Sequence, residues 1–74
     1  MNEEELKKIY VSNIRKLREA RGLTQFQLAE KAHITEKYLS AIETHKKWGS
    51  FETLVSLANA LEVEPYELLL PPQT

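Results

Sequence analysis

Two helix-start signals lie close together near the middle of this chain, and they restrict its fold most. Thr24 and Gln27 have capping-box spacing, in which each side chain accepts a hydrogen bond from a backbone N–H left free at a helix start. Thr35 is positioned to cap a second helix. The chain between the two caps has room only for a short helix ending near Ala32 and a tight turn at His33-Ile34. The segment therefore predicts two short helices joined by a turn of a few residues.

The rest of the chain also has helical spacing. A first helix is predicted from about Glu3 to Arg21, ended by Gly22. Its inward stripe, at spacings of three and four, comprises Leu6, Tyr10, Ile14 and Leu17. Ser50 is expected to cap a fourth helix, and Pro65 to start a short fifth helix at a position where a missing N–H does no harm. No segment alternates as a strand does, so the predicted class is all-α.

The helix that follows Thr35 is expected to run from Glu36 to about Thr44. Leu39 and Ile42 form its inward pair, so its polar residues lie on the outward face. Such a strip fits the major groove of DNA, which is about 12 Å wide. Taken alone, a strip of this kind is more often a plain solvated surface.

At this point the chain resembles a known family. GLTQFQLAEKAHITEKYLSAIE is similar to the lambda-repressor/Cro-type (XRE) helix-turn-helix, and GSFETLVSLANALEVEPYELL continues the resemblance, which covers roughly residues 9–70. The resemblance implies a compact five-helix domain over residues 1–74, with the helix-turn-helix at about 24–43 and a frayed tail at 71–74. It also implies a transcriptional regulator, of repressor or controller type, that binds double-stranded DNA sequence-specifically through a major-groove recognition helix.

The resemblance assigns roles to individual residues. Gln25 matches a phosphate-contacting glutamine, while Glu36, Lys37 and Ala41 match positions that face base edges. For Tyr38, contact with a phosphate and simple packing are equally open. Lys46 and Lys47 suit phosphate contact, with plain solubility as the alternative. The complete predicted DNA-binding set is Thr24, Gln25, Thr35, Glu36, Lys37, Tyr38, Ser40, Ala41, Thr44, Lys46 and Lys47.

Arg18 and Glu43 match a buried ion pair of the family, between the first helix and the end of the third. The alternative is a surface salt bridge worth little. The chain also departs from the family pattern where glycine is frequent, with His33 in the turn, His45 after the third helix and Glu62 after the fourth. A further departure is Gly49, in place of a frequent proline. Trp48 is expected to pack under its loop, with DNA or partner contact as alternatives.

Charge is unevenly distributed although the net charge is −1. Residues 6–47 hold all ten Lys and Arg and a net charge of +6, whereas residues 48–74 hold −4. A basic end of this kind suits a phosphate backbone. The apolar part of the acidic end is unsuited to DNA and is the expected homodimer surface on a palindromic operator. Its candidate residues are Val63, Tyr66, Leu69 and Leu70; closing the monomer core is the alternative role for the last two.

Other functional classes find little support. There is no cysteine or aspartate, no catalytic motif and no metal-ligand cluster, so neither an enzyme nor a cofactor or metal site is expected. Neither a membrane span nor a secretory signal is predicted, which favours the cytoplasm. No small-molecule effector is evident. The other candidate function is an antitoxin-like or assembly module that uses the same fold to hold a protein. The operator, the regulated genes, and activation versus repression stay open.

Overall fold

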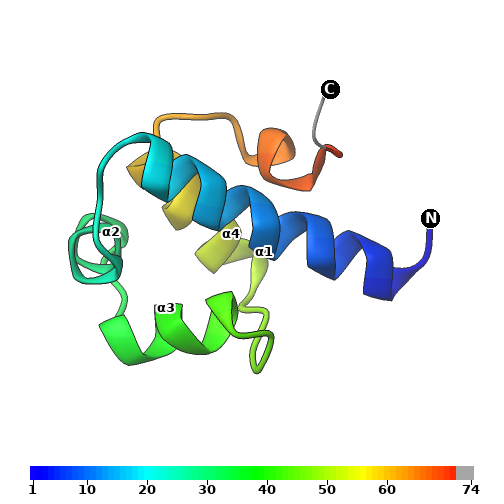
Figure 1. Cartoon of the computed structure of the whole chain (residues 1–74), viewed down its shortest axis with the longest axis horizontal. Coiled ribbons are helices and arrows are strands. Elements are labelled where there is room, and N and C mark those ends of the chain that lie inside the picture. Colours follow the sequence, from blue (N-terminus) through cyan, green and yellow to red (C-terminus); the bar gives the residue numbers. More distant parts are fainter. Residues whose placement is uncertain (72–74) are drawn as a thin grey trace.

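A computed structural model describes residues 1–71 as a helical bundle (Figure 1). Its elements are α1 (Glu3–Ala20), α2 (Gln25–Ala32), α3 (Glu36–Glu43), α4 (Phe51–Ala60) and the 3₁₀ helix η1 (Pro65–Leu69). No strand occurs within this part of the chain, so the predicted all-α class is confirmed. Of the predicted frayed tail at 71–74, residues 72–74 lie outside the described residues.

Local chemistry at the helix starts explains these boundaries. The Thr24 side chain accepts from the backbone N–H of Gln27 at 3.0 Å, and the Gln27 side chain accepts from the N–H of Thr24 at 2.9 Å. The predicted capping box is therefore present. Thr35 and Ser50 accept in the same way from residues three positions later, at 3.0 and 3.2 Å. Each cap satisfies an N–H that its helix leaves free, which stabilises the helix by about 1 kcal/mol.

The predicted count of five α-helices is wrong by one, because the last element is a short 3₁₀ helix. Pro65 opens it, and the Glu67 carboxylate accepts from the backbone N–H of Glu64 at 2.7 Å. The side chain of Asn13 donates to the carbonyls of Leu68 at 3.0 Å and of Leu70 at 2.8 Å. These bonds tie the end of η1 to α1, and Pro71, which follows Leu70, holds Leu70 in an extended conformation that ends the helix.

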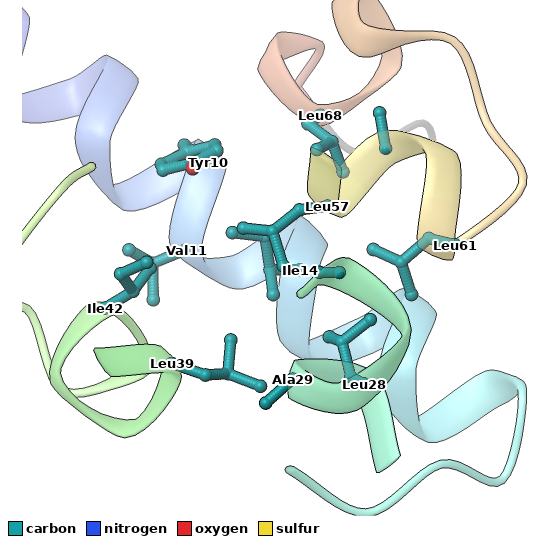
Figure 2. Close-up of a cluster of buried hydrophobic side chains, with 12 residues drawn as sticks. Tyr10, Val11, Ile14, Leu28, Ala29, Leu39, Ile42, Leu57, Leu61 and Leu68 are labelled. Atoms are coloured by element: carbon teal, nitrogen blue, oxygen red, sulfur yellow. The ribbon is translucent and has the colours of Figure 1, made fainter. Parts of the chain in front are cut away.

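The core lies between α1, the α2–α3 pair, α4 and η1 (Figure 2). Each of these elements contributes side chains that are 0% exposed: Ile14, Leu28, Leu39, Ile42, Leu57, Leu61 and Leu68. Truncating one such leucine to alanine costs about 2–5 kcal/mol, a large share of the stability of a domain this small. The orientation of α3 is therefore fixed by Leu39 and Ile42.

The inward stripe predicted for α1 is partly wrong. Tyr10 and Ile14 are buried, but Leu6 is 37% exposed, whereas Val11 is 1% exposed and belongs to the core. The reason is that the first turns of α1 project beyond the bundle toward the N-terminus (Figure 1). Helical spacing identifies a face, but it does not show where along the helix the partner elements end.

Within residues 1–71, three residues other than glycine adopt the left-handed conformation. They are His33, His45 and Glu62, with φ of 59°, 64° and 61°. At these three positions the family frequently has glycine. The chain therefore keeps the left-handed backbone that glycine would allow, although it carries a larger side chain there. A side chain in this conformation costs roughly 1–2 kcal/mol. The helix ends are therefore sites of stored strain.

Candidate nucleic-acid interface

The outward face of α3 presents polar side chains near its start. Glu36 and Lys37 are exposed in the first turn, and Ser40 and Ala41 are half-buried one turn later. At the other end, the hydroxyl of Thr44 donates to the carbonyl of Ser40 at 2.8 Å, which caps the helix and leaves the residue exposed. A charged N-terminal end with small residues behind it suits insertion into a major groove.

Tyr38 lies at the border between the face and the core. It is half-buried, and its hydroxyl lies 3.4 Å from that of Thr53 on α4. The Nζ of Lys47 lies 5.9 Å from the centre of its ring. These contacts favour the packing role over phosphate contact. Tyr38 thus connects α3 to α4 and supports the loop that carries Lys47.

Behind the face, Glu43 accepts hydrogen bonds from two elements. It is 4% exposed, and Arg18 of α1 donates to it through Nε at 2.9 Å and Nη2 at 3.1 Å. Gln25 of α2 donates to the same carboxylate at 3.1 Å. The third arm of Arg18 donates to the Leu23 carbonyl at 2.9 Å. The carboxylate therefore connects α1, α2 and α3 at one buried point.

The side chain of Gln25, matched to a phosphate-contacting glutamine, is therefore engaged inside the protein. Its Nε2 is used by Glu43, and the residue is half-buried. Sequence reasoning missed this contact, because nothing in the local spacing of Gln25 and Glu43 reveals it. Thr24 and Thr35, the caps of α2 and α3, remain exposed. Their helix starts keep backbone N–H groups on the surface, where anions are favoured.

The loop after α3 presents two lysines toward solvent. Lys46 and Lys47 are exposed, while their backbone N–H groups both donate to the Ala41 carbonyl, at 2.8 and 3.2 Å. Trp48 is half-buried against the core, and the ring of His45 meets it edge-on at 5.9 Å. This is the expected packing of Trp48 under its loop. The Nζ of Lys7 lies 4.7 Å from the centre of the Trp48 ring, a cation–π contact.

Three of the four predicted dimer residues line two different depressions. Leu69 borders an apolar groove together with Leu6 and Phe51, whereas Val63 and Leu70 line a separate depression beside α1. Tyr66 is 62% exposed. Sequence reasoning missed Phe51, which is 84% exposed, because an apolar residue after a helix cap is expected to pack.

Within residues 1–71, the structure has no cluster of His, Cys, Asp or Glu that is able to hold a metal ion. None of the helices described is long and apolar enough to cross a membrane.

Comparison with known proteins agrees with this geometry. The family model described as "Helix-turn-helix" matches residues 14–68. The chain belongs to this family. Its match spans the two short helices, the turn between them and the packing elements on either side, and this family is of the XRE, lambda-repressor type that the sequence resembles.

Relatives of the chain are named as regulators. It is 36% identical over 73 residues to a hypothetical transcription factor of Neisseria meningitidis serogroup B, covering 97% of this chain and 68% of the relative. It is 32% identical over 65 residues to the control protein C.SmaI of Serratia marcescens, covering 88% and 77%. These relatives place this helix-turn-helix protein among DNA-binding regulators of transcription.

Crystal structures of related proteins share the fold. The hypothetical transcription factor NHTF from Neisseria has a TM-score of 0.89 at 33% identity, over 99% of this chain and 84% of that one. The restriction-modification controller C.AhdI from Aeromonas hydrophila has a TM-score of 0.79 at 31% identity, over 90% and 98%. The agreement extends along most of the chain and is not confined to the two-helix motif.

Proposed function

We propose that this helix-turn-helix protein regulates transcription as a homodimer, each copy placing α3 in the major groove of one half of a palindromic site. The observation that carries the proposal is the division of α3 into two faces. Leu39 and Ile42 are 0% exposed, while Glu36 and Lys37 extend from the capped start of the helix. In helix-turn-helix proteins this end of the second helix contacts base edges.

Each side chain has a distinct proposed role. Lys37 donates to guanine O6 and N7, and Glu36 accepts from the amine of cytosine. Ala41 contacts a thymine methyl group, and Ser40 and Thr44 border the groove. Lys46 and Lys47 bind phosphates, as do the backbone N–H groups at the helix starts capped by Thr24 and Thr35.

Dimerisation follows from the size of the contact surface. One eight-residue helix contacts only a few base pairs, whereas two copies about one helical turn apart double the length of the site. No catalytic step, cofactor or effector enters the proposal, and activity on chromosomal DNA places it in the cytoplasm.

Selection of binding sites from random DNA tests this function. We expect enrichment of an inverted repeat whose half-sites are about 10–10.5 base pairs apart. Lys37→Ala should bind the best site roughly tenfold more weakly, with the loss confined to one position in each half-site. Lys31→Ala, which removes an exposed lysine near the end of α2, is the matched control and should bind as the unmodified protein does. Enrichment of no sequence would contradict DNA recognition and would favour the protein-binding module.

A further inference from the structure

An apolar groove lies at one end of the molecule and is not part of the face that α3 presents. It has a volume of about 440 Å³, and its apolar lining comes from α1, the loop after α3, α4 and η1. We name it the terminal groove, and it comprises Leu6, Tyr10, Trp48, Phe51 and Leu69. At its rim Phe51 is 84% exposed. The patch therefore contains both an exposed aromatic side chain (the knob) and an apolar groove able to receive such a side chain (the hole).

We propose that the terminal groove is the homodimer interface, in which Phe51 of each copy enters the groove of the other. This rests on the dimer proposed above and moves the interface away from Val63, Tyr66 and Leu70. In a two-fold symmetric dimer the same patch must be complementary to itself. A knob and a hole on one patch meet that condition, and a buried aromatic anchor at the centre of an interface carries much of the binding energy.

The rim that α1 contributes carries charges of both signs. Lys7 and Glu3 line it and form an ion pair at 2.8 Å, in which Glu3 is largely exposed. Glu52, the only charged residue of α4, stands beside Phe51. When Phe51 enters the partner's groove, Glu52 approaches the Glu3–Lys7 pair and shares its lysine, so the apolar contact of Phe51 carries the pairing and the charged edge accommodates it.

The position of the groove along the molecule also fits two-site DNA binding. The molecule is 31 Å along its longest axis, and α1 begins near one extreme of that axis, with α2 near the other (Figure 1). Half-sites one helical turn apart are separated by about 34–36 Å. Pairing end to end through the terminal groove therefore gives two α3 helices a separation of this order. It also brings the two Lys46–Lys47 loops toward the centre of the operator.

The test is the association state of the full chain without DNA. Sedimentation at tens of micromolar should show a dimer that Phe51→Glu dissociates, raising the dissociation constant roughly tenfold or more. Phe26→Glu is the matched control, since Phe26 is 56% exposed on α2 and its substitution should leave the dimer intact. Leu70→Glu should also leave it intact. A dimer that survives Phe51→Glu but not Leu70→Glu would overturn the terminal groove.

Cross-linking gives a second measurement that does not depend on a charged substitution. The chain has no cysteine, so a Phe51→Cys chain mixed with a differently tagged Leu6→Cys chain should form a disulfide between the two copies under mild oxidation. A mixture of Phe26→Cys and Leu6→Cys should not. If no Phe51–Leu6 cross-link forms, even on operator DNA, the interface proposal is wrong.

These outcomes are separable from failure of the proposed function. Both proposals are supported if the Phe51→Glu protein is a monomer that still binds the selected DNA. Its affinity for the full site should then be weaker, and its base preference within each half-site should be unchanged. Sequence-specific binding with an undisturbed dimer in Phe51→Glu rejects the interface alone.

Discussion

Arg18 forms a two-pronged hydrogen-bonded ion pair with Glu43, with donor–acceptor distances of 2.9 and 3.1 Å, although the two residues lie 25 positions apart. The side chains are only 13% and 3% exposed. A buried pair contributes little net stability against a well-packed apolar pair, but removal of one partner leaves the other charge desolvated and alone. The pair therefore fixes how α1 and the end of α3 meet.

Glu43→Ala should lower the free energy of unfolding by about 3 kcal/mol or more, because it leaves Arg18 buried without a counter-charge. It also removes the acceptor of Gln25. Urea denaturation measures the change. Glu30→Ala, an exposed glutamate of α2, is the matched control and should stay within about 0.5 kcal/mol of the unmodified protein. If the urea midpoint of Glu43→Ala equals that of Glu30→Ala, the Arg18–Glu43 pair is screened by solvent and the prediction is wrong.

The local parts of this fold were predictable from the sequence, and the long-range parts were not. The Thr24–Gln27 box lies within one turn, so residue spacing alone identifies it. The contact of Gln25 with Glu43 joins residues 18 positions apart, and no periodicity encodes it. Asn13 likewise binds the end of η1 from a helix 55 or more positions away. Placement of Glu36 and Lys37 on the open face was predictable, because Leu39 and Ile42 fix the rotation of α3.

Glu62→Gly should stabilise the protein by about 0.5–1 kcal/mol. Glu62 has a φ of 61°, so replacement with glycine relieves a left-handed strain of roughly 1–2 kcal/mol. Greater freedom of the unfolded chain offsets part of that gain. Glu52→Gly, the same substitution in the first turn of α4, should instead destabilise by about 1 kcal/mol. Thermal melts of both variants measure the change in melting temperature. Equal shifts of the same sign in the two variants would contradict the strain argument.

Tyr10 makes the stability depend on alkaline pH. Burial, with a contribution from Tyr38, raises the pKa of Tyr10 from 10.0 to about 12. Between these values the folded protein holds the proton more tightly than the unfolded chain does. The stabilisation is therefore fully present below pH 10 and is lost as pH rises toward 12, by about 2–3 kcal/mol in total.

Tyr10→Phe isolates this effect. The hydroxyl of Tyr10 is buried and has no hydrogen-bond partner among the described residues, so its removal should raise stability at neutral pH by about 1 kcal/mol. The variant should also lose less stability than the unmodified protein between pH 10 and 12. Tyr66→Phe, at a 62% exposed position, is the control and should reproduce the unmodified pH profile in denaturant melts.

Lys46→Ala should weaken binding to all DNA sequences about equally. A lysine that binds a phosphate releases one counterion, so the slope of log affinity against log salt should become shallower by about 0.9. Titrations at several salt concentrations measure the slope. Lys31→Ala, at an exposed position near the end of α2, removes the same charge outside the predicted DNA-binding set and should leave the slope unchanged. Equal slopes for Lys46→Ala and the unmodified protein would remove Lys46 from the phosphate contacts.

Glu36→Ala should raise affinity for non-specific DNA while relaxing preference at one base pair. A carboxylate close to phosphates opposes binding, and this cost is useful only if the carboxylate accepts from a cytosine amine and is left unpaired against other bases. Binding to a panel of singly substituted operators measures the preference, with Glu30→Ala as the matched acidic control. If both variants keep the unmodified preference profile, Glu36 lies outside the base-contacting set. The gain in non-specific affinity would then reflect only the lost repulsion between the carboxylate and the DNA backbone.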